Sequence, residues 1–213
     1  MTDVPIADRP ESLTSGRLSA GVIVACEAGQ EIAQARDADR LYRLVDGWAF
    51  DARILEDGRR QIVSFLLPGE LVNAGPVLGS RGGLPLYALT DISMATDKGR
   101  GTGDALPAVL AQMTRLGDQV ISLGRRTAYE RIAAFLLQIA ERLDESTGRA
   151  AGQRYLVPLR LEHLADHLGL SVVHVSRTLR QLRENGLASL YRGELELGDR
   201  RVLTRICEYR PGR

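Results

Sequence analysis

Residues 164–186 read LADHLGLSVVHVSRTLRQLRENG, and this stretch decides the fold. Two helical runs flank Gly169, a residue suited to a turn that requires a positive φ, and Ser171 can cap the second run. Ala165 lies four residues before the glycine and is small enough for a second helix to cross it closely. Val175 lies six residues after the glycine, so the spacing predicts a helix-turn-helix. Its shared core is expected from Leu164, Leu168, Val175, Leu179 and Leu182.

The second helix of this motif has polar and basic side chains on its first turns, which suits a surface that enters the major groove of DNA. We expect Val173, His174, Ser176 and Arg177 to face the base edges, with Ser171, Arg180 and Arg192 on phosphates. The following residues predict a β-hairpin wing with turns at Arg192-Gly193 and Gly198-Asp199. A plain helical hairpin is the alternative interpretation of the same pattern.

The charge distribution agrees with a nucleic-acid partner for the C-terminal end. The 213-residue chain has a net charge of +1, but residues 1–104 hold 11 basic and 15 acidic side chains. Residues 150–213 hold 11 basic and 7 acidic side chains. The basic end contains the helix-turn-helix, which favours a polyanionic partner there, although a solvated basic surface would give the same balance.

The N-terminal half has the turn residues and short apolar runs of a β protein. Residues 18–104 read as short strands separated by glycine and proline turns. Asp46-Gly47 interrupts one alternating run, and Asp57-Gly58 separates two apolar runs as in a β-hairpin. Because strands do not alternate with helices here, a dinucleotide-binding fold is not expected. The pattern predicts an all-β barrel or roll.

Helical periodicity begins at Asp104, which can cap a helix, and Pro107 fits the first turn. Apolar residues then recur at the spacing of a coiled-coil seam over three heptads, ending at Thr127. The expected homodimer interface comprises Leu106, Val109, Met113, Leu116, Val120 and Leu123. Packing of this helix on its own β domain is the alternative. A second amphipathic helix follows, with Ile132, Phe135, Leu136, Ile139 and Leu143 on its apolar face.

Three stretches together resemble the Crp–Fnr superfamily of bacterial transcription regulators, with the pattern of the Fnr–FixK branch. They are DGRRQIVSFLLPGEL in the roll, GRRTAYERIAAFLLQIAERL in the helical region, and LEHLADHLGLSVVHVSRTLRQLRENGL followed by DRRVLTRI. The resemblance implies a homodimer that binds double-stranded DNA at a palindromic promoter site, with RNA polymerase as a further partner. In that branch a Glu-x-x-Ser-Arg motif reads DNA. Val173 stands here at the glutamate position, whereas Ser176 and Arg177 match the motif.

The departures from the family concern its effectors. Members that bind cyclic AMP carry a Gly-Glu pair for the ribose and an Arg-Ser pair for the phosphate. The corresponding positions hold Asn73-Ala74 and Pro85-Leu86, and Arg81 could substitute only in a rebuilt loop. A phosphate without a neutralising arginine would be buried unpaired, so cyclic AMP is not expected and the effector is unknown.

No cofactor or metal is expected either. Two cysteines, Cys26 and Cys207, cannot supply the four ligands of an iron–sulfur cluster. We expect both to be free buried thiols, with a redox switch as the alternative. All three histidines lie in the C-terminal segment, so the roll has none for haem or a cupin-type metal. His163 and His167 have a zinc-capable spacing but lack the glutamate of a HExxH motif, and we expect solvated helix positions.

The expected fold is α+β, in three parts. Residues 1–104 form a β-roll like that of cyclic-nucleotide-binding domains, residues 105–147 the dimerisation helix and the following helix, and residues 148–213 a winged helix-turn-helix. We expect a DNA-binding transcription regulator in the cytoplasm, because neither a signal peptide nor a membrane-spanning run is found. A β-barrel enzyme without a metal is one alternative, although no nucleophile elbow, P-loop or acid–base pair is found. A protein-interaction module that does not bind DNA is the other.

Overall fold

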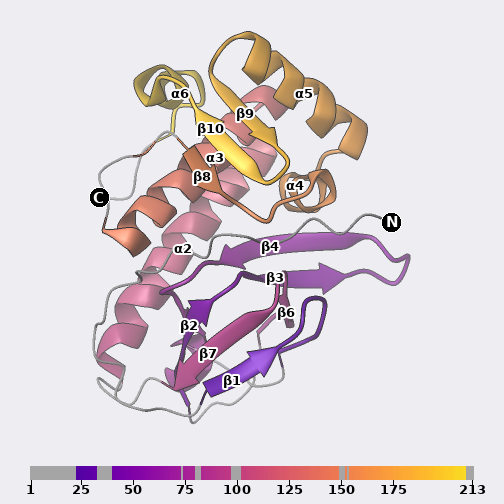
Figure 1. The fold of residues 1–213 in the computed structure, drawn as a ribbon. Helices are drawn as coiled ribbons and strands as arrows, with labels where there is room; N and C mark the ends of the chain where they lie inside the picture. The colour runs from indigo at the N-terminus through magenta and orange to yellow at the C-terminus, as the bar shows by residue number, and fades with distance from the viewer. Residues whose placement is uncertain are drawn as a thin grey trace, which may run out of the picture.

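The computed structural model describes residues 23–32, 40–72, 74–79, 83–96, 102–148, 152 and 154–209. An N-terminal β domain and a C-terminal unit of helices and a small sheet are joined by two long helices, α2 and α3 (Figure 1). This arrangement is the expected α+β architecture. None of the helices in these ranges is long and apolar enough to cross a membrane.

The described part of the β domain contains two antiparallel sheets. One has the strand order β1-β7-β2-β5 and the other β4-β3-β6. The strands are β1 (Ile23–Cys26), β2 (Tyr42–Asp46), β3 (Ala49–Ile54), β4 (Arg60–Leu66), β5 (Leu71–Val72), β6 (Leu86–Ala88) and β7 (Ile92–Thr96), with a short helix α1 (Ala74–Val77). Since all the pairings are antiparallel, the predicted roll is confirmed.

The two turns that the sequence indicated have different roles. At Asp46-Gly47 the chain passes from one sheet to the other, since β2 and β3 pair with different strands. Gly47 has a φ of 80°, and a Cβ there would lie 2.2 Å from the Asp91 carbonyl oxygen, so only glycine fits. At Asp57-Gly58 the chain forms the expected hairpin, in which β3 pairs with β4. Gly58 has a φ of 84°.

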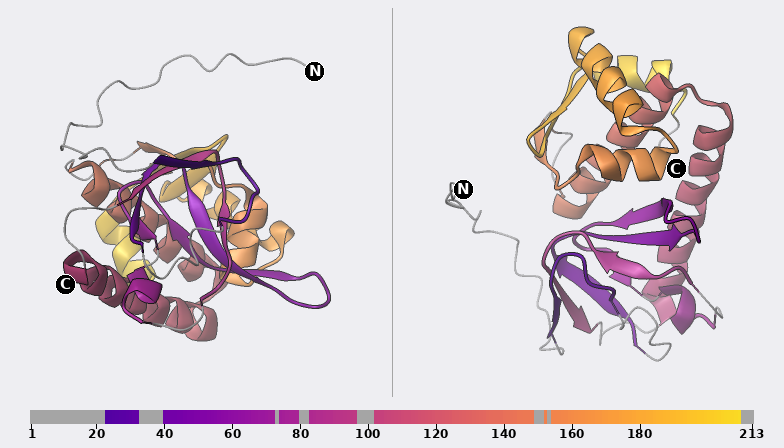
Figure 2. Two further views of the ribbon diagram at one scale, coloured as in Figure 1. Left: turned by 90° about the horizontal axis from the view of Figure 1, so that it is seen from below. Right: turned by 90° about the vertical axis from the view of Figure 1, so that its right-hand side faces the viewer.

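Helix α2 (Thr102–Arg125) runs along the β domain, and α3 (Ala128–Thr147) returns beneath the C-terminal unit (Figure 2). Helix α2 begins at Thr102, so Asp104 lies within its first turn and does not precede the helix as a cap. Pro107 lies inside the helix, beyond the first turn in which it was expected. Thr127 does not continue the seam. It is the N-cap of α3, where its hydroxyl accepts the Glu130 N–H in a capping box.

Helix α3 is buried on more than the one face that its amphipathic pattern indicated. Residues 132–137 are all buried, as are Ile139 and Ala140. One side packs on the roll, where the rings of Phe135 and Phe65 lie 5.7 Å apart, and the other packs on the C-terminal unit. Arg142 adds a polar tie to the roll: its guanidinium donates to the Glu70 carboxylate, at 2.6 and 3.0 Å, and to the Phe65 carbonyl.

The C-terminal unit contains β8 (Arg154–Leu156), α4 (Leu161–Leu168), α5 (Val172–Glu184), β9 (Ala188–Tyr191), β10 (Glu194–Leu197) and α6 (Arg200–Ile206). The wing is a three-stranded sheet of order β8-β10-β9. The predicted turn at Gly198-Asp199 is wrong, because residues 200–206 form α6 and not a strand. The Asp199 carboxylate accepts the N–H groups of Arg201 and Val202, so this aspartate is an N-cap.

Candidate nucleic-acid interface

The turn between α4 and α5 has the geometry that its sequence indicated. Gly169 has a φ of 64° and ends α4, where its N–H donates to the Ala165 carbonyl oxygen. The Ser171 hydroxyl accepts the His174 N–H and caps α5. Ala165 and the five predicted core residues, Leu164, Leu168, Val175, Leu179 and Leu182, are all buried. The helix-turn-helix is therefore confirmed as a packed unit.

Helix α5 presents a continuous polar face to solvent. Ser171, Val173, His174, Ser176, Arg177 and Arg180 are all exposed, Val173 by 67 %. Among the described residues, the Arg177 and Arg180 guanidinium groups have no hydrogen-bonding partner within the protein. An exposed apolar side chain followed on the same helix by unpaired cations suits a surface that touches thymine methyl groups and guanine edges.

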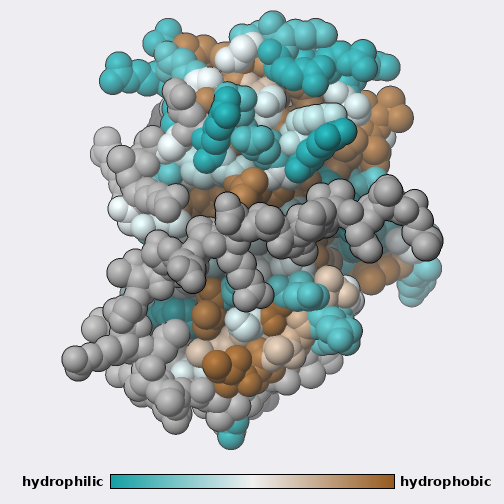
Figure 3. All heavy atoms as spheres, viewed as in Figure 1, coloured by the Kyte–Doolittle hydropathy of each residue, from teal (hydrophilic) through white to brown (hydrophobic). Residues whose placement is uncertain are grey.

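The wing lies beside this helix, and hydrophilic side chains cover much of the end of the molecule formed by α5 and α6 (Figure 3). The hairpin between β9 and β10 turns at Arg192, with a φ of 51°, and Gly193, with a φ of 80°, as the sequence predicted. The Arg192 guanidinium lies 5.3 Å from the centre of the exposed Tyr191 ring. A cation is thus held at the tip of the wing.

The expectation for His163 and His167 is wrong: both side chains are buried, at 5 % and 4 % exposure. His163 Nδ1 accepts the Arg160 N–H at the start of α4. His167 Nδ1 lies 3.1 Å from the Ile62 carbonyl oxygen of β4, and its ring packs against Phe65 and Phe135. Burial lowers the pKa of both imidazoles, that of His167 to about 4. They are structural contacts between α4 and its neighbours.

The six residues predicted for a dimer interface lie on two different faces of α2. Leu106, Met113 and Val120 are exposed, whereas Val109, Leu116 and Leu123 are half-buried on the inner face. Val109 packs on the cluster of Leu41, Ala74 and Ala105. The exposed apolar stripe, which we call the α2 stripe, consists of Leu106, Leu110, Met113, Val120 and Ile121. Leu106, Met113 and Val120 recur in it every seven residues, on one side of the helix.

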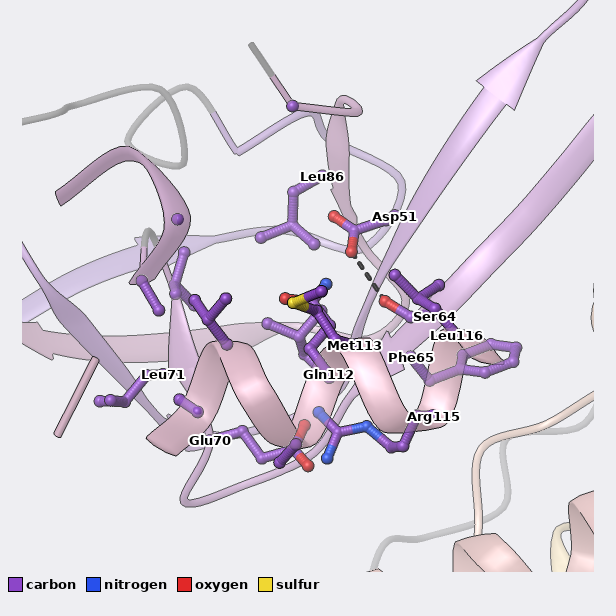
Figure 4. Close-up of a pocket in the computed structure, with 18 of the residues that line it drawn as sticks. Asp51, Ser64, Phe65, Glu70, Leu71, Leu86, Gln112, Met113, Arg115 and Leu116 are labelled. Carbon is purple, nitrogen blue, oxygen red and sulfur yellow. Dashed lines mark hydrogen bonds between the residues drawn. The ribbon is translucent and has the colours of Figure 1, made fainter. Parts of the chain in front are cut away.

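A cavity of about 760 Å³ lies between the roll and α2 (Figure 4). Asp51 and Ser64 line it from the roll, with the Ser64 hydroxyl donating to the Asp51 carboxylate at 2.7 Å. Burial raises the pKa of Asp51 to about 6. Arg115 of α2 lines it near Glu70. Leu86 is a buried β6 side chain. Asn73 and Arg81 lie outside the described residues.

The described residues contain no group of three or more histidine, cysteine, aspartate or glutamate side chains that could hold a metal. Cys207 is buried, as expected, and burial raises the pKa of its thiol. Cys26 is half-buried on β1, so the expectation of burial is only partly met there. Both thiols are free.

Comparison with known proteins gives the same assignment as the geometry. A family model described as the Crp-like helix-turn-helix domain matches residues 130–206. The nitrogen fixation regulation protein FixK of Rhizobium meliloti is 34 % identical over 174 residues, covering 79 % of both chains. The transcriptional activator protein FnrL of Cereibacter sphaeroides is 31 % identical, covering 77 % of this chain and 71 % of the relative.

A solved structure of FixK2 from Bradyrhizobium japonicum superposes with a TM-score of 0.72 at 25 % identity, covering 91 % of this chain and all of that one. The structure of TTHB099, a CRP-family regulator from Thermus thermophilus, has a TM-score of 0.65 at 22 % identity and covers 87 % of this chain and 96 % of its own, which supports the fold alone. These relatives are transcription regulators and not enzymes. The chain therefore belongs to the Crp–Fnr family of DNA-binding transcription regulators, in its Fnr–FixK branch.

Proposed function

We propose that the protein binds a palindromic promoter site as a homodimer and reads each half-site with α5. The observation that carries this proposal is the exposed face of α5, on which Val173 lies between the unpaired guanidinium groups and the Ser171 cap. Two copies of α5 related by a two-fold axis would meet successive major grooves about one helical turn apart.

Within each half-site, Arg177 is assigned to a guanine, because a guanidinium can donate two parallel hydrogen bonds to O6 and N7. Val173 is assigned to a thymine methyl group, since its side chain cannot accept a hydrogen bond from a cytosine amino group as glutamate would. His174 and Ser176 supply further donors on the same turns. Ser171, Arg180 and Arg192 are assigned to phosphates, which position the protein without reading sequence.

The α2 stripe supports the dimer. Leu106, Met113 and Val120 are 53 %, 62 % and 70 % exposed, an unusual density of apolar side chains for one face of a solvated helix. Gly117 and Gly124 lie on the same face, and a Cβ built on either would meet nothing. A second copy of α2 packed along this face would bury the stripe.

We further propose that the chain has three parts, divided at residues 104 and 147. They are a sensor-like roll, a dimerisation region and a DNA-binding unit. RNA polymerase is the expected partner at a promoter, in keeping with the activator names of relatives such as FnrL. The cytoplasm is the expected location.

Selection of binding sites from random double-stranded DNA tests the function. We expect a two-fold site that keeps the guanine read by Arg177 and departs from the Fnr–FixK half-site at the base pair opposite Val173. Binding should weaken steeply with salt, since several phosphates are neutralised. Recovery of an unaltered Fnr–FixK half-site would refute the role of Val173, and absence of any enriched sequence would refute sequence-specific binding.

A further inference from the structure

The C-terminal end of α4 is held by side chains from three other elements. The amide of Gln119, in α2, donates to the His167 carbonyl oxygen at 2.7 Å. The amide of Gln61, in β4, donates to the same oxygen at 3.0 Å. The guanidinium of Arg131, in α3, donates to the Leu168 carbonyl oxygen at 3.0 Å. We call Gln61, Gln119 and Arg131 the α4 clamp.

The clamp donates hydrogen bonds to backbone carbonyl groups that have no partner within the helix itself. The last carbonyl groups of a helix have no partner within it and are usually met by water or by the following turn. Here the turn supplies only the N–H groups of Gly169 and Leu170, and both of them donate to Ala165. The carbonyl groups of residues 167 and 168 are instead bonded by the clamp. The position of the α4 end therefore depends on α2, α3 and β4 together.

Arg131 also connects this point to the end of the proposed dimer helix. Its guanidinium donates to the Leu123 carbonyl oxygen at 2.9 Å and to the Arg126 carbonyl oxygen at 3.0 Å. One side chain thus bonds the C-terminal ends of α2 and α4. Gly169 lies against the same place, since a Cβ there would be 3.4 Å from the Leu123 side chain.

The roll makes a second set of contacts with α4, which lies directly over β4 (Figure 1). Arg60 forms an ion pair with Asp166 at 2.7 Å, and His167 Nδ1 lies against the Ile62 carbonyl oxygen. Only Gly169 and Leu170 separate α4 from the Ser171 cap of α5. A displacement of the clamped end would consequently be passed on to the first turn of α5, where the base-reading residues lie.

From these contacts we infer that Gln61, Gln119 and Arg131 are positioning residues for DNA recognition, which hold α5 at one angle to α2. The inference rests on the proposed homodimer. If α2 lies on the two-fold axis, the clamp sets the distance and rotation between the two copies of α5. The clamp would thereby determine which spacing between half-sites the dimer accepts.

Changing the spacing by one base pair tests this directly, because it rotates one half-site by about 35° about the DNA axis. Palindromes with the selected half-site and spacers altered by one and two base pairs are compared in titrations of the full-length protein. We expect the wild type to prefer one spacer by about tenfold or more. Gln119→Met and Gln61→Met remove a donor at nearly constant volume, and should reduce this preference to about threefold or less without changing the half-site sequence.

Three controls separate positioning from general stability. Gln112→Met makes the same chemical change two turns earlier on α2, at a side chain without a hydrogen bond to α4, and should keep the wild-type preference. Gln119→Lys restores a donor and should regain most of the preference. Urea titration of each variant measures the cost to folding independently of DNA.

The outcomes are distinct. A wild type that prefers one spacer, with clamp variants that accept several, supports the inference. Clamp variants that lose affinity equally for all spacers, or that keep the wild-type preference, overturn it and leave the proposed function standing. A wild type that binds no palindrome refutes the proposed function, and the inference with it.

Discussion

Acidification provides a quantitative test of the buried contact between His167 and β4. The imidazole is neutral in the folded protein, because burial lowers its pKa from 6.5 to about 4. Between these values the unfolded chain binds a proton that the folded chain does not. Stability that is fully present above about pH 6.5 is therefore lost as the pH falls towards 4. His167→Gln keeps a side-chain donor near the Ile62 carbonyl oxygen and removes the titration.

Two groups titrate in opposite directions over this range. Lowering the pH from 7 to 5 should cost about 2 kcal/mol at His167. Asp51 has a pKa raised by burial from 3.8 to about 6, so its folded form takes up a proton first and stability rises by about 1 kcal/mol as the pH falls. These two contributions partly offset each other in the wild type. Burial also lowers the pKa of His163, which adds to the loss in every variant and cancels in comparisons.

Urea unfolding at fixed protein concentration, at pH 7 and pH 5, measures these effects. His167→Gln should lose about 2 kcal/mol less than the wild type on acidification, whatever its own stability at pH 7. Asp51→Asn, which can still accept the Ser64 hydrogen bond, should lose about 1 kcal/mol more than the wild type. If His167→Gln and the wild type showed the same pH dependence of stability, the assignment of a neutral, buried His167 would be wrong. Asp51→Asn tests the method itself, since its effect has the opposite sign.

Arg177→Ala should cost about 1–3 kcal/mol and relax preference at one base pair, whereas Arg180→Ala should weaken binding to all sequences and reduce the salt slope; titrations with matched and mismatched sites distinguish the two. Met113→Glu combined with Val120→Glu places charges on the α2 stripe and should give monomers that no longer bind the palindrome, and a double variant that sediments as a dimer would contradict this. Cyclic AMP and cyclic GMP should give no heat in calorimetry at micromolar concentrations, because the phosphate-binding arginine and serine positions hold Pro85 and Leu86; micromolar binding of either would contradict the assignment.

The parts of the fold that sequence reasoning predicted well are those set by local chemistry. The glycine turn at Gly169, the Ser171 cap and the hairpin turn at Arg192-Gly193 each require a particular residue at a particular backbone angle. The core of the helix-turn-helix follows from spacing on two adjacent helices. The sequence predicts a turn and a wing segment where α6 forms, because Asp199 suits both a turn and an N-cap and seven residues are too few for a clear period.

The parts that were missed depend on contacts distant along the chain. His167 lies on an ordinary-looking helix face, and its ring is buried by β4, 105 residues earlier, and by Phe135 of α3. No local pattern in the sequence distinguishes Gln61 or Gln119, although both donate to the end of α4. A weak signal was available in α2, where apolar residues continue around both sides of the helix. The 3-4 spacing mixed two faces of the helix. Leu106, Met113 and Val120 recur every seven residues on the exposed side, whereas Val109, Leu116 and Leu123 recur three residues later on the side packed on the roll.

Because α3 is buried on both sides, dividing the chain at residue 147 would cut through one continuous hydrophobic core. Phe65 of the roll, Phe135 of α3 and the ring of His167 in α4 are in mutual contact. Val175 and Leu179 of α5 belong to the same apolar cluster as Phe50 of β3. Removing α3 would expose the inner side of the helix-turn-helix, which agrees with a family match that begins at residue 130. Since the roll and the DNA-binding unit share this core and the α4 clamp, a change in the packing of β4 has a physical route to α5.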